Sequence, residues 1–312
     1  MVGKRGGATT AYPAGVSAIV TVPPHATFLD EVAAHPIVSG LRLNTVMPIK
    51  GARTDALRRL AALGPPLWVD LKGRQLRVTH AAVPPFTEVR VSHTIRVRTP
   101  CDAFFSDGRE HARILEVDGD RLILEDSPRR VVGPGESVNV IDPTLEIDGT
   151  LTATDRDYLA AMKEIGLSRV MLSFVERTDD VEEVATLLPG ATIALKIESA
   201  RGIELARRHG ARLGRLVCAR GDLYVEVLRP HAIVRATREL LDLDPDAIVA
   251  SRIFPSLARG PVPDCPDVND VGFLLAIGYR TFMLGDEVCQ RRDSVLAALE
   301  LLWSLASDWG RA

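Results

Sequence analysis

One rhythm dominates the chain: a short run of apolar, strand-type residues followed by an amphipathic stretch of helical length, repeated eight times. Nearly continuous apolar strands that alternate with helices indicate a parallel sheet covered on its outer side. Eight such strands predict a closed (β/α)8 TIM barrel, with an open doubly wound sheet as the competing topology. The strand-type runs are Ser17–Val22, Leu41–Leu43, Leu67–Leu71, Arg169–Ser173, Thr192–Lys196, Leu216–Ala219, Ala247–Ser251 and Thr281–Leu284.

The rhythm breaks once, between about residues 78 and 148. There polar and apolar residues alternate, and turns rich in Gly, Asp and Pro separate the alternating runs. This pattern predicts a small all-β domain inserted after the third strand, where it forms a lid over one barrel rim. We therefore divide the chain into a barrel, residues 1–77 and 149–312, and a lid, residues 78–148. The histidines of the insert, His80 and His93, are expected on the lid surface.

The composition of the chain excludes several classes of binding partner. The chain has 312 residues, a hydrophobic content of 46% and a formal net charge of −3, which argue against general affinity for nucleic acid or acidic membranes. No apolar stretch approaches the roughly 18 residues of a membrane span. The four cysteines are too sparse for a zinc ribbon or a disulfide scaffold, and no dinucleotide-binding or phosphate-loop motif is present. We expect a cytoplasmic protein that acts on small molecules.

Two carboxylates stand at the ends of neighbouring strands. Glu198 follows the fifth strand and Asp222 follows the sixth, and the carboxyl ends of barrel strands share one rim. Hard oxygen ligands of this kind suit Mg²⁺ or Mn²⁺. Lys196 precedes Glu198 by two residues, so its side chain points to the same side of the strand. The alternatives are helix caps or rim salt bridges for the carboxylates and a buried structural ion pair for the lysine.

Other polar residues at the predicted rim are candidates for binding an anion. Arg42 lies at the end of the second strand and Arg77 just beyond the third, and a guanidinium matches the geometry of a phosphoryl group. Gly221, after Arg220, permits close approach of the backbone to a substrate carboxylate. Only five of the 38 basic residues are lysine, so the alternative for each arginine is an ordinary surface charge.

These residues, in their order along the chain, resemble pyruvate kinases from about Ser17 to Leu299. Each stretch alone is weakly specific, whereas the ordered set with a lid after the third strand is specific. The matching stretches are Arg42-Leu43-Asn44, Asp70-Leu71-Lys72-Gly73 with Arg77, Val138-Asn139, Leu151-Thr152, Ser173-Phe174-Val175, Lys196-Ile197-Glu198, Ala219-Arg220-Gly221-Asp222-Leu223, Asp270-Val271 and Phe282-Met283-Leu284.

The resemblance implies roles for individual residues. Glu198 and Asp222 would hold the divalent ion, and Lys196 would stabilise the transferring phosphoryl group and the developing enolate. Arg42 would contact phosphate, and Ser251 would stand where the family's threonine helps to protonate the enolate. The residues expected to bind substrate or nucleotide are Asn44, Asp70, Arg77, Arg220 and Gly221, with Arg77 facing the nucleotide phosphates.

The chain also departs from the family pattern. After Asn44 the family has Phe-Ser-His-Gly, whereas residues 45–48 read Thr-Val-Met-Pro, which removes a hydroxyl ligand of the monovalent cation and a histidine near the nucleotide. The resemblance ends after the eighth helix, so the C-terminal regulatory domain and its allosteric control are expected to be absent. Further replacements are Leu71 for threonine, Tyr224 for glycine, Arg252 for glutamine and Gly285-Asp286 for Ser-Gly.

Three functional hypotheses follow. The first is a Mg²⁺-dependent phosphotransferase that acts on phosphoenolpyruvate or a close analogue through an enolate, with ADP or ATP as the nucleotide. The second is a metal-dependent aldolase or decarboxylase, a lyase acting on pyruvate or another 2-oxo acid. The third is a non-catalytic binding protein. Barrels of this kind usually pair through their outer helices, so we expect a homo-oligomer.

Overall fold

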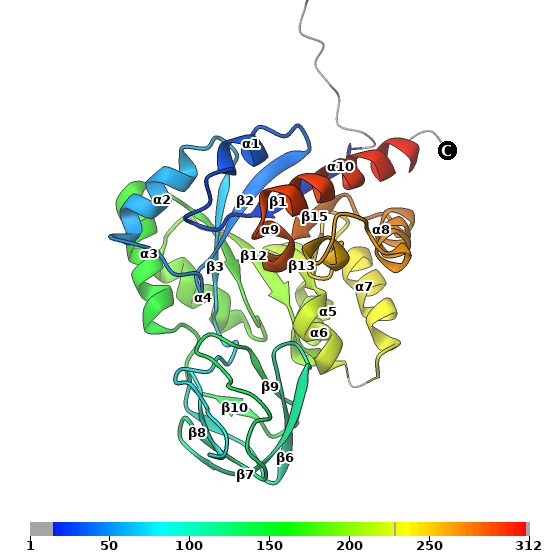
Figure 1. The fold of residues 1–312 in the computed structure, drawn as a ribbon. Coiled ribbons are helices and arrows are strands. Elements are labelled where there is room, and N and C mark those ends of the chain that lie inside the picture. The colour runs from blue at the N-terminus through cyan, green and yellow to red at the C-terminus, as the bar shows by residue number, and fades with distance from the viewer. Residues whose placement is uncertain (1–14, 228, 310–312) are drawn as a thin grey trace, which may run out of the picture.

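Eight parallel strands close on themselves in the computed structural model, which describes residues 15–227 and 229–309 (Figure 1). β1 pairs with both β2 and β15, and this closure excludes the open sheet. The predicted TIM barrel is therefore confirmed. Its strands are β1 (Ser17–Thr21), β2 (Val38–Asn44), β3 (Leu67–Leu71), β11 (Arg169–Leu172), β12 (Thr192–Ile197), β13 (Arg215–Ala219), β14 (Ile248–Ala250) and β15 (Thr281–Leu284).

Helices cover the outside of the barrel (Figure 1). Local sequence sets their ends: Thr152 and Asp155 form a capping box at the start of α3, and Gly166 ends it with a left-handed φ of 75°. The helices are α1 (Leu29–Ala33), α2 (Arg53–Ala61), α3 (Ala153–Ile165), α4 (Thr178–Leu187), α5 (Ala200–His209), α6 (Arg220–Glu226), α7 (Ala232–Leu243), α8 (Cys265–Ile277), α9 (Asp286–Cys289) and α10 (Arg292–Trp309), with 3₁₀ turns η2 (Gly210–Leu213) and η3 (Pro255–Ala258).

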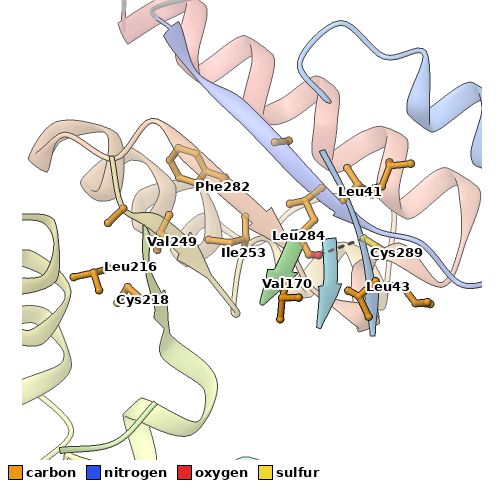
Figure 2. Packing of buried hydrophobic residues seen from close by; sticks show 14 of the residues in the cluster. Leu41, Leu43, Val170, Leu216, Cys218, Val249, Ile253, Phe282, Leu284 and Cys289 are labelled. Atoms are coloured by element: carbon orange, nitrogen blue, oxygen red, sulfur yellow. Dashed lines mark hydrogen bonds between the residues drawn. The ribbon is translucent and has the colours of Figure 1, made fainter. Parts of the chain in front are cut away.

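Alternate strand residues point outward into the layer between barrel and helices. Leu43, Val170 and Phe282, on three different strands, are fully buried there (Figure 2). Cys289 of α9 belongs to the same layer, and its thiol lies 3.7 Å from the carbonyl oxygen of Leu284. Burying one large aliphatic side chain stabilises a fold by roughly 1.5–3 kcal/mol, so this layer is the main source of stability.

The strand residues that alternate with these outward-facing ones point into the barrel. They form a separate apolar cluster that includes Ile19, Trp68 and Met171. Gly40 leaves room for the indole, because a Cβ at this position would lie 3.4 Å from the ring of Trp68. Two residues further along their strands come Arg42 and Asp70. The period of two therefore places an apolar floor in the barrel and a charged layer at the carboxyl ends of the strands.

The insert forms its own antiparallel sheet after β3, in the order β4-β8-β7-β6-β9, together with a β10-β5 pair. A second apolar core, separate from that of the barrel, fills it. The predicted all-β insert is thus confirmed, while its limits at residues 78 and 148 stay a prediction. The strands are β4 (Glu88–Arg90), β5 (Ile95–Arg96), β6 (Cys101–Phe105), β7 (Glu110–Asp118), β8 (Arg121–Leu124), β9 (Val138–Val140) and β10 (Glu146–Ile147).

The surface position expected for His93 is wrong. Its side chain is buried, and burial lowers the pKa of the imidazole. The alternation of the insert did not reveal this, because a residue beside a short strand can face either the sheet or the hinge to the barrel. Within residues 15–227 and 229–309, none of the helices combines the length and the apolar character needed to cross a membrane.

Candidate active site

Lys196 lies at the centre of the charged layer. Its Nζ donates to Ser173 Oγ at 2.8 Å and lies 3.2 Å from Glu198 Oε1 and 3.4 Å from Asp70 Oδ1. Burial disfavours the ammonium form, but the carboxylates of Asp70 and Glu198 outweigh burial and raise the pKa of Lys196. The site thus contains a desolvated cation that stays charged at neutral pH.

Asp70 organises the cations around it. Arg42 donates to Asp70 Oδ2 through Nε at 2.9 Å and also through Nη2, and Lys72 Nζ lies 3.4 Å from the same oxygen. Burial opposes ionisation, yet Lys196, Lys72 and Arg42 lower the pKa of Asp70 far below its ordinary value. The pKa of Lys72 itself falls to about 7, chiefly because of burial. Asp70 is therefore a permanent anion that fixes three basic side chains.

The end of β3 is held by the first turn of α3. Asp155 accepts from the backbone N–H of Lys72 at 2.9 Å and from that of Gly73 at 3.1 Å. Gly73 has a φ of 51°, and a Cβ there would lie 2.6 Å from the carbonyl oxygen of Ser173. No other residue fits this turn, which aligns the strand end carrying Lys72 with the strand end carrying Ser173.

Glu198 and Asp222 form a second acidic pair. Glu198 Oε2 accepts from the N–H of Phe174 at 2.9 Å, and Asp222 Oδ2 accepts from Gln75 Nε2 at 2.7 Å. The other oxygen of Asp222 is buried and has no hydrogen-bond partner among residues 15–227 and 229–309. Burial and then the charges of Glu198 and Asp107 raise the pKa of Asp222 to about 7. The two carboxylates are close enough to repel each other, and one of their oxygens has no partner. The pair would therefore be stabilised by an added positive charge.

These donors fit a divalent cation. The unpartnered oxygen of Asp222 and the neighbouring Glu198 are hard oxygen ligands, the type that Mg²⁺ and Mn²⁺ prefer. In the described residues no group of three or more His, Cys, Asp or Glu side chains is arranged to hold a metal. Two protein ligands are nonetheless usual for Mg²⁺, which keeps several waters and takes further oxygens from its substrate.

Asp286 occupies the outer edge of the Arg42 guanidinium. Arg42 Nη1 donates to Asp286 Oδ1 at 3.0 Å and to Thr21 Oγ1 at 2.9 Å, and Asn44 Nδ2 donates to Asp286 Oδ2 at 2.7 Å. Two residues predicted to bind substrate thus share one carboxylate from the start of α9. The only sequence signal for this contact is the acidic residue after the eighth strand.

Arg77 and Arg220, predicted to bind ligands, contact protein atoms. Arg220 forms two 2.8 Å bonds to Asp270 and donates to the carbonyl oxygen of Ser251 at 3.1 Å. Arg77 donates to Gly135 O at 2.6 Å and to the side-chain oxygen of the glutamine at position 75. Arg220 therefore fixes the end of β14, and Arg77 joins the barrel rim to the lid.

Ser251 and Gly221 face each other at the rim. Ser251 has a φ of 65°, and a Cβ on Gly221 would lie 3.4 Å from Ser251 Oγ and 3.8 Å from Asp107 Oδ2 of the lid. Gly221 belongs to the first turn of α6 rather than to a free loop. Two departures from the family pattern meet nearby, because the guanidinium of Arg252 stacks 4.3 Å from the ring centre of Tyr224.

The lid contacts the rim beside this charged layer. Asn139 of β9 donates to Glu226 of α6 at 3.1 Å, and Arg109 pairs with Glu287 of α9. A mostly apolar cavity of about 410 Å³ lies next to Asn139 and Glu226, and no member of the charged layer described above lines it. Sequence reasoning missed Gln75, Glu226 and this cavity, since all three depend on how the lid packs against the barrel.

Comparison with known proteins agrees with this architecture. The family described as "Pyruvate kinase, barrel domain" matches residues 69–292. A pyruvate kinase of Agrobacterium vitis is 32% identical over 60% of the chain, and those of Borreliella burgdorferi and Methanocaldococcus jannaschii are 22% and 25% identical over 77% and 58%. The chain covers 39%, 56% and 42% of these relatives. Because the family match spans well over half of the chain, the protein belongs to the pyruvate kinase family.

Proposed function

We propose that the protein is a Mg²⁺-dependent phosphotransferase that acts on phosphoenolpyruvate, or a close analogue, through an enolate. The observation that carries the proposal is the position of Lys196, a buried cation between Asp70 and Glu198. Enolate formation places negative charge on one oxygen, and a fixed ammonium in a desolvated site stabilises that charge without reorganising. The family membership supports the same reaction class.

The residues of the charged layer divide the work. Lys196 neutralises the developing charge, and Arg42 and Asn44 orient the phosphoryl group. A divalent ion held by Glu198 and Asp222 would supply Lewis-acid neutralisation of the same oxygens. The unpartnered oxygen of Asp222 supports this assignment.

The remaining candidate residues are assigned to proton transfer and to the nucleotide that accepts the phosphoryl group. Ser251 Oγ lies beside Gly221 and would help to deliver a proton to the enolate carbon as pyruvate forms. Arg77 stands between rim and lid, where the nucleotide phosphates would enter, and Arg220 keeps β14 in place through Asp270. In the forward direction the phosphoryl group leaves the enol oxygen for ADP, and the enolate takes up one proton.

Incubation of the purified protein with phosphoenolpyruvate, ADP and Mg²⁺ tests the proposal, with ATP and pyruvate measured separately. We expect both products, and a loss of at least about 100-fold in the Glu198→Gln variant because a buried ligand is removed. Glu182→Gln, which changes an exposed glutamate of α4, is the matched control. Equal rates in wild type and Glu198→Gln, or no product from any nucleotide, would reject it.

A lyase acting on pyruvate or another 2-oxo acid is the second candidate. The contact of Asp286 with Arg42 and Asn44 favours it, because a reaction without a phosphoryl group does not need those two residues for phosphate. Metal-dependent exchange of the methyl protons of pyruvate in D₂O, without nucleotide, combined with absence of phosphoryl transfer, would support this class. If Mg²⁺ with oxalate, an enolate mimic, shows no binding by calorimetry, both enzymatic readings fail and a non-catalytic protein is left.

A further inference from the structure

The carboxylate of Asp286 lies where the proposed reaction needs a free guanidinium. Asp286 is the first residue of α9, and its two oxygens accept from Arg42 at 3.0 Å and from Asn44 at 2.7 Å. Both contacts are charge-assisted or short, the kind of hydrogen bond that contributes most.

A count of donors shows what the contact removes. A guanidinium has five N–H groups. In Arg42, Nε and one N–H of Nη2 bind Asp70, and the two N–H groups of Nη1 bind Thr21 and Asp286. One N–H is left without a partner among the described residues. A phosphoryl group held by two parallel N–H···O bonds therefore requires Asp286 to withdraw.

The charges around Arg42 also indicate that Asp286 and a phosphoryl group cannot both bind it. Arg42 already faces Asp70, so with Asp286 it meets two carboxylates, and both raise its pKa against the effect of burial. The substrate phosphoryl group would bring about two further negative charges to this place. Like charges close together repel strongly in a partly desolvated site. Binding of phosphate here must displace the Asp286 carboxylate, whose side chain is 40% exposed and has solvent to move into.

The carboxylate end of a substrate has no such competitor. Lys196 lies on β12, Glu198 directly follows it and Asp222 lies in the first turn of α6. Among the residues that the structure describes, none of the three forms a hydrogen bond or ion pair with Asp286. A 2-oxo acid or its enolate, which needs only these residues, binds without moving α9.

We propose that Asp286 is a specificity-determining residue that competes with a substrate's phosphoryl group for Arg42 and Asn44. It thereby shifts the preference of the site from phosphorylated enol esters toward unphosphorylated 2-oxo acids and their enolates. The inference rests on the proposed function, because it assigns the Arg42 edge to phosphate. It concerns affinity ratios, however, and holds for either candidate reaction.

Calorimetric titrations of wild type, Asp286→Gly and Asp286→Asn test the inference, with oxalate and phosphoenolpyruvate in Mg²⁺ and with inorganic phosphate alone. We expect phosphoenolpyruvate and phosphate to bind at least about tenfold more tightly to Asp286→Gly, a gain of one charge-assisted contact. Oxalate should change less than about twofold. Asp286→Asn, which keeps the shape of the side chain, should show a smaller gain and serves if the glycine variant does not fold.

Asp293→Asn is the control for a general loss of negative charge, because Asp293 lies on α10 with a fully solvated side chain. Unchanged or weaker binding of phosphate and phosphoenolpyruvate in both Asp286 variants would overturn the inference. Failure of oxalate to bind any of the proteins would instead reject the metal and lysine site. The phosphate titration would still report on Arg42 in that case, so the two failures are distinguishable.

Discussion

At the scale of single residues, the buried charges of this site act as one unit. Lys196, Arg42 and Lys72 each contact Asp70. A buried ion pair contributes little net stability when complete, yet removal of one partner leaves an uncompensated charge. Function and stability are therefore coupled here, and a test of either must measure both.

Replacing Lys196 by methionine is the sharpest test of this coupling. The change keeps the volume but leaves Asp70 and Glu198 without their shared cation, so the free energy of unfolding should fall by about 3–5 kcal/mol. Exchange of the pyruvate methyl protons should fall at least about 100-fold, since the cation that stabilises the enolate is lost. Urea denaturation and NMR in D₂O measure the two effects. Lys163→Met, on the exposed side of α3, should alter neither.

Glu226 should make the free energy of unfolding depend on pH. Burial raises the pKa of this carboxyl from 4.5 to about 8, with Glu176 and Asp222 adding to the shift and the bond from Asn139 opposing it. The native state therefore keeps a proton that the unfolded chain has lost. The stabilisation from this bound proton is full below pH 4.5 and is lost as the pH rises toward 8, and the difference between the two pKa values corresponds to on the order of 5 kcal/mol.

Denaturation of wild type and Glu226→Gln at pH 5, 7 and 9 measures this contribution. The glutamine keeps a side chain that can bond Asn139 but cannot ionise, so its advantage over wild type should grow as the pH rises. Glu182→Gln sets the effect of neutralising an exposed carboxylate. A constant difference between wild type and Glu226→Gln across the three pH values would show that Glu226 is ionised in the native protein.

At the scale of secondary-structure elements, the first turn of helix α3 fixes the end of strand β3. Asp155 belongs to the capping box of α3 and also accepts from two backbone N–H groups of the turn after β3. The sequence carries the signal for this helix start, because Thr152 is followed three residues later by an acid. It did not predict the bonds to the turn, which join residues more than eighty positions apart.

The two roles of Asp155 can be separated. Thr152→Ala removes the helix cap alone and should cost about 1 kcal/mol. Asp155→Ala removes the cap and also leaves two buried N–H groups unsatisfied, so it should cost roughly 3–5 kcal/mol and misplace Lys72. Urea denaturation gives both values. If the two variants are equally stable, the bonds from the β3 turn contribute nothing and another contact fixes the strand end.

At the scale of the whole molecule, what sequence reasoning found and missed follows from the range of the interactions. Periodicity located all eight strands and the insert, since burial acts on each segment separately. It also placed Lys196 and Glu198 on one side of a strand, because two residues of a strand share a face. The contacts of Asp286 with Arg42 and of Glu226 with Asn139 were beyond it, because their partners are set only by the closed barrel and the packed lid.

The separate cores of barrel and lid lead to the last prediction. Replacing residues 78–148 by a short Gly/Ser linker removes the lid core except for Leu76 and leaves the barrel core intact, so the barrel should keep its circular dichroism and unfold cooperatively. Glu198, Asp222 and Lys196 all lie on the barrel, and oxalate with Mg²⁺ should still bind, about tenfold more weakly because water is no longer excluded. Turnover of phosphoenolpyruvate should fall at least about 100-fold, since the nucleotide side loses the lid that Arg77 contacts. A lidless protein that is unfolded would show instead that the two cores form one cooperative unit, and one that turns over normally would place the nucleotide away from the lid.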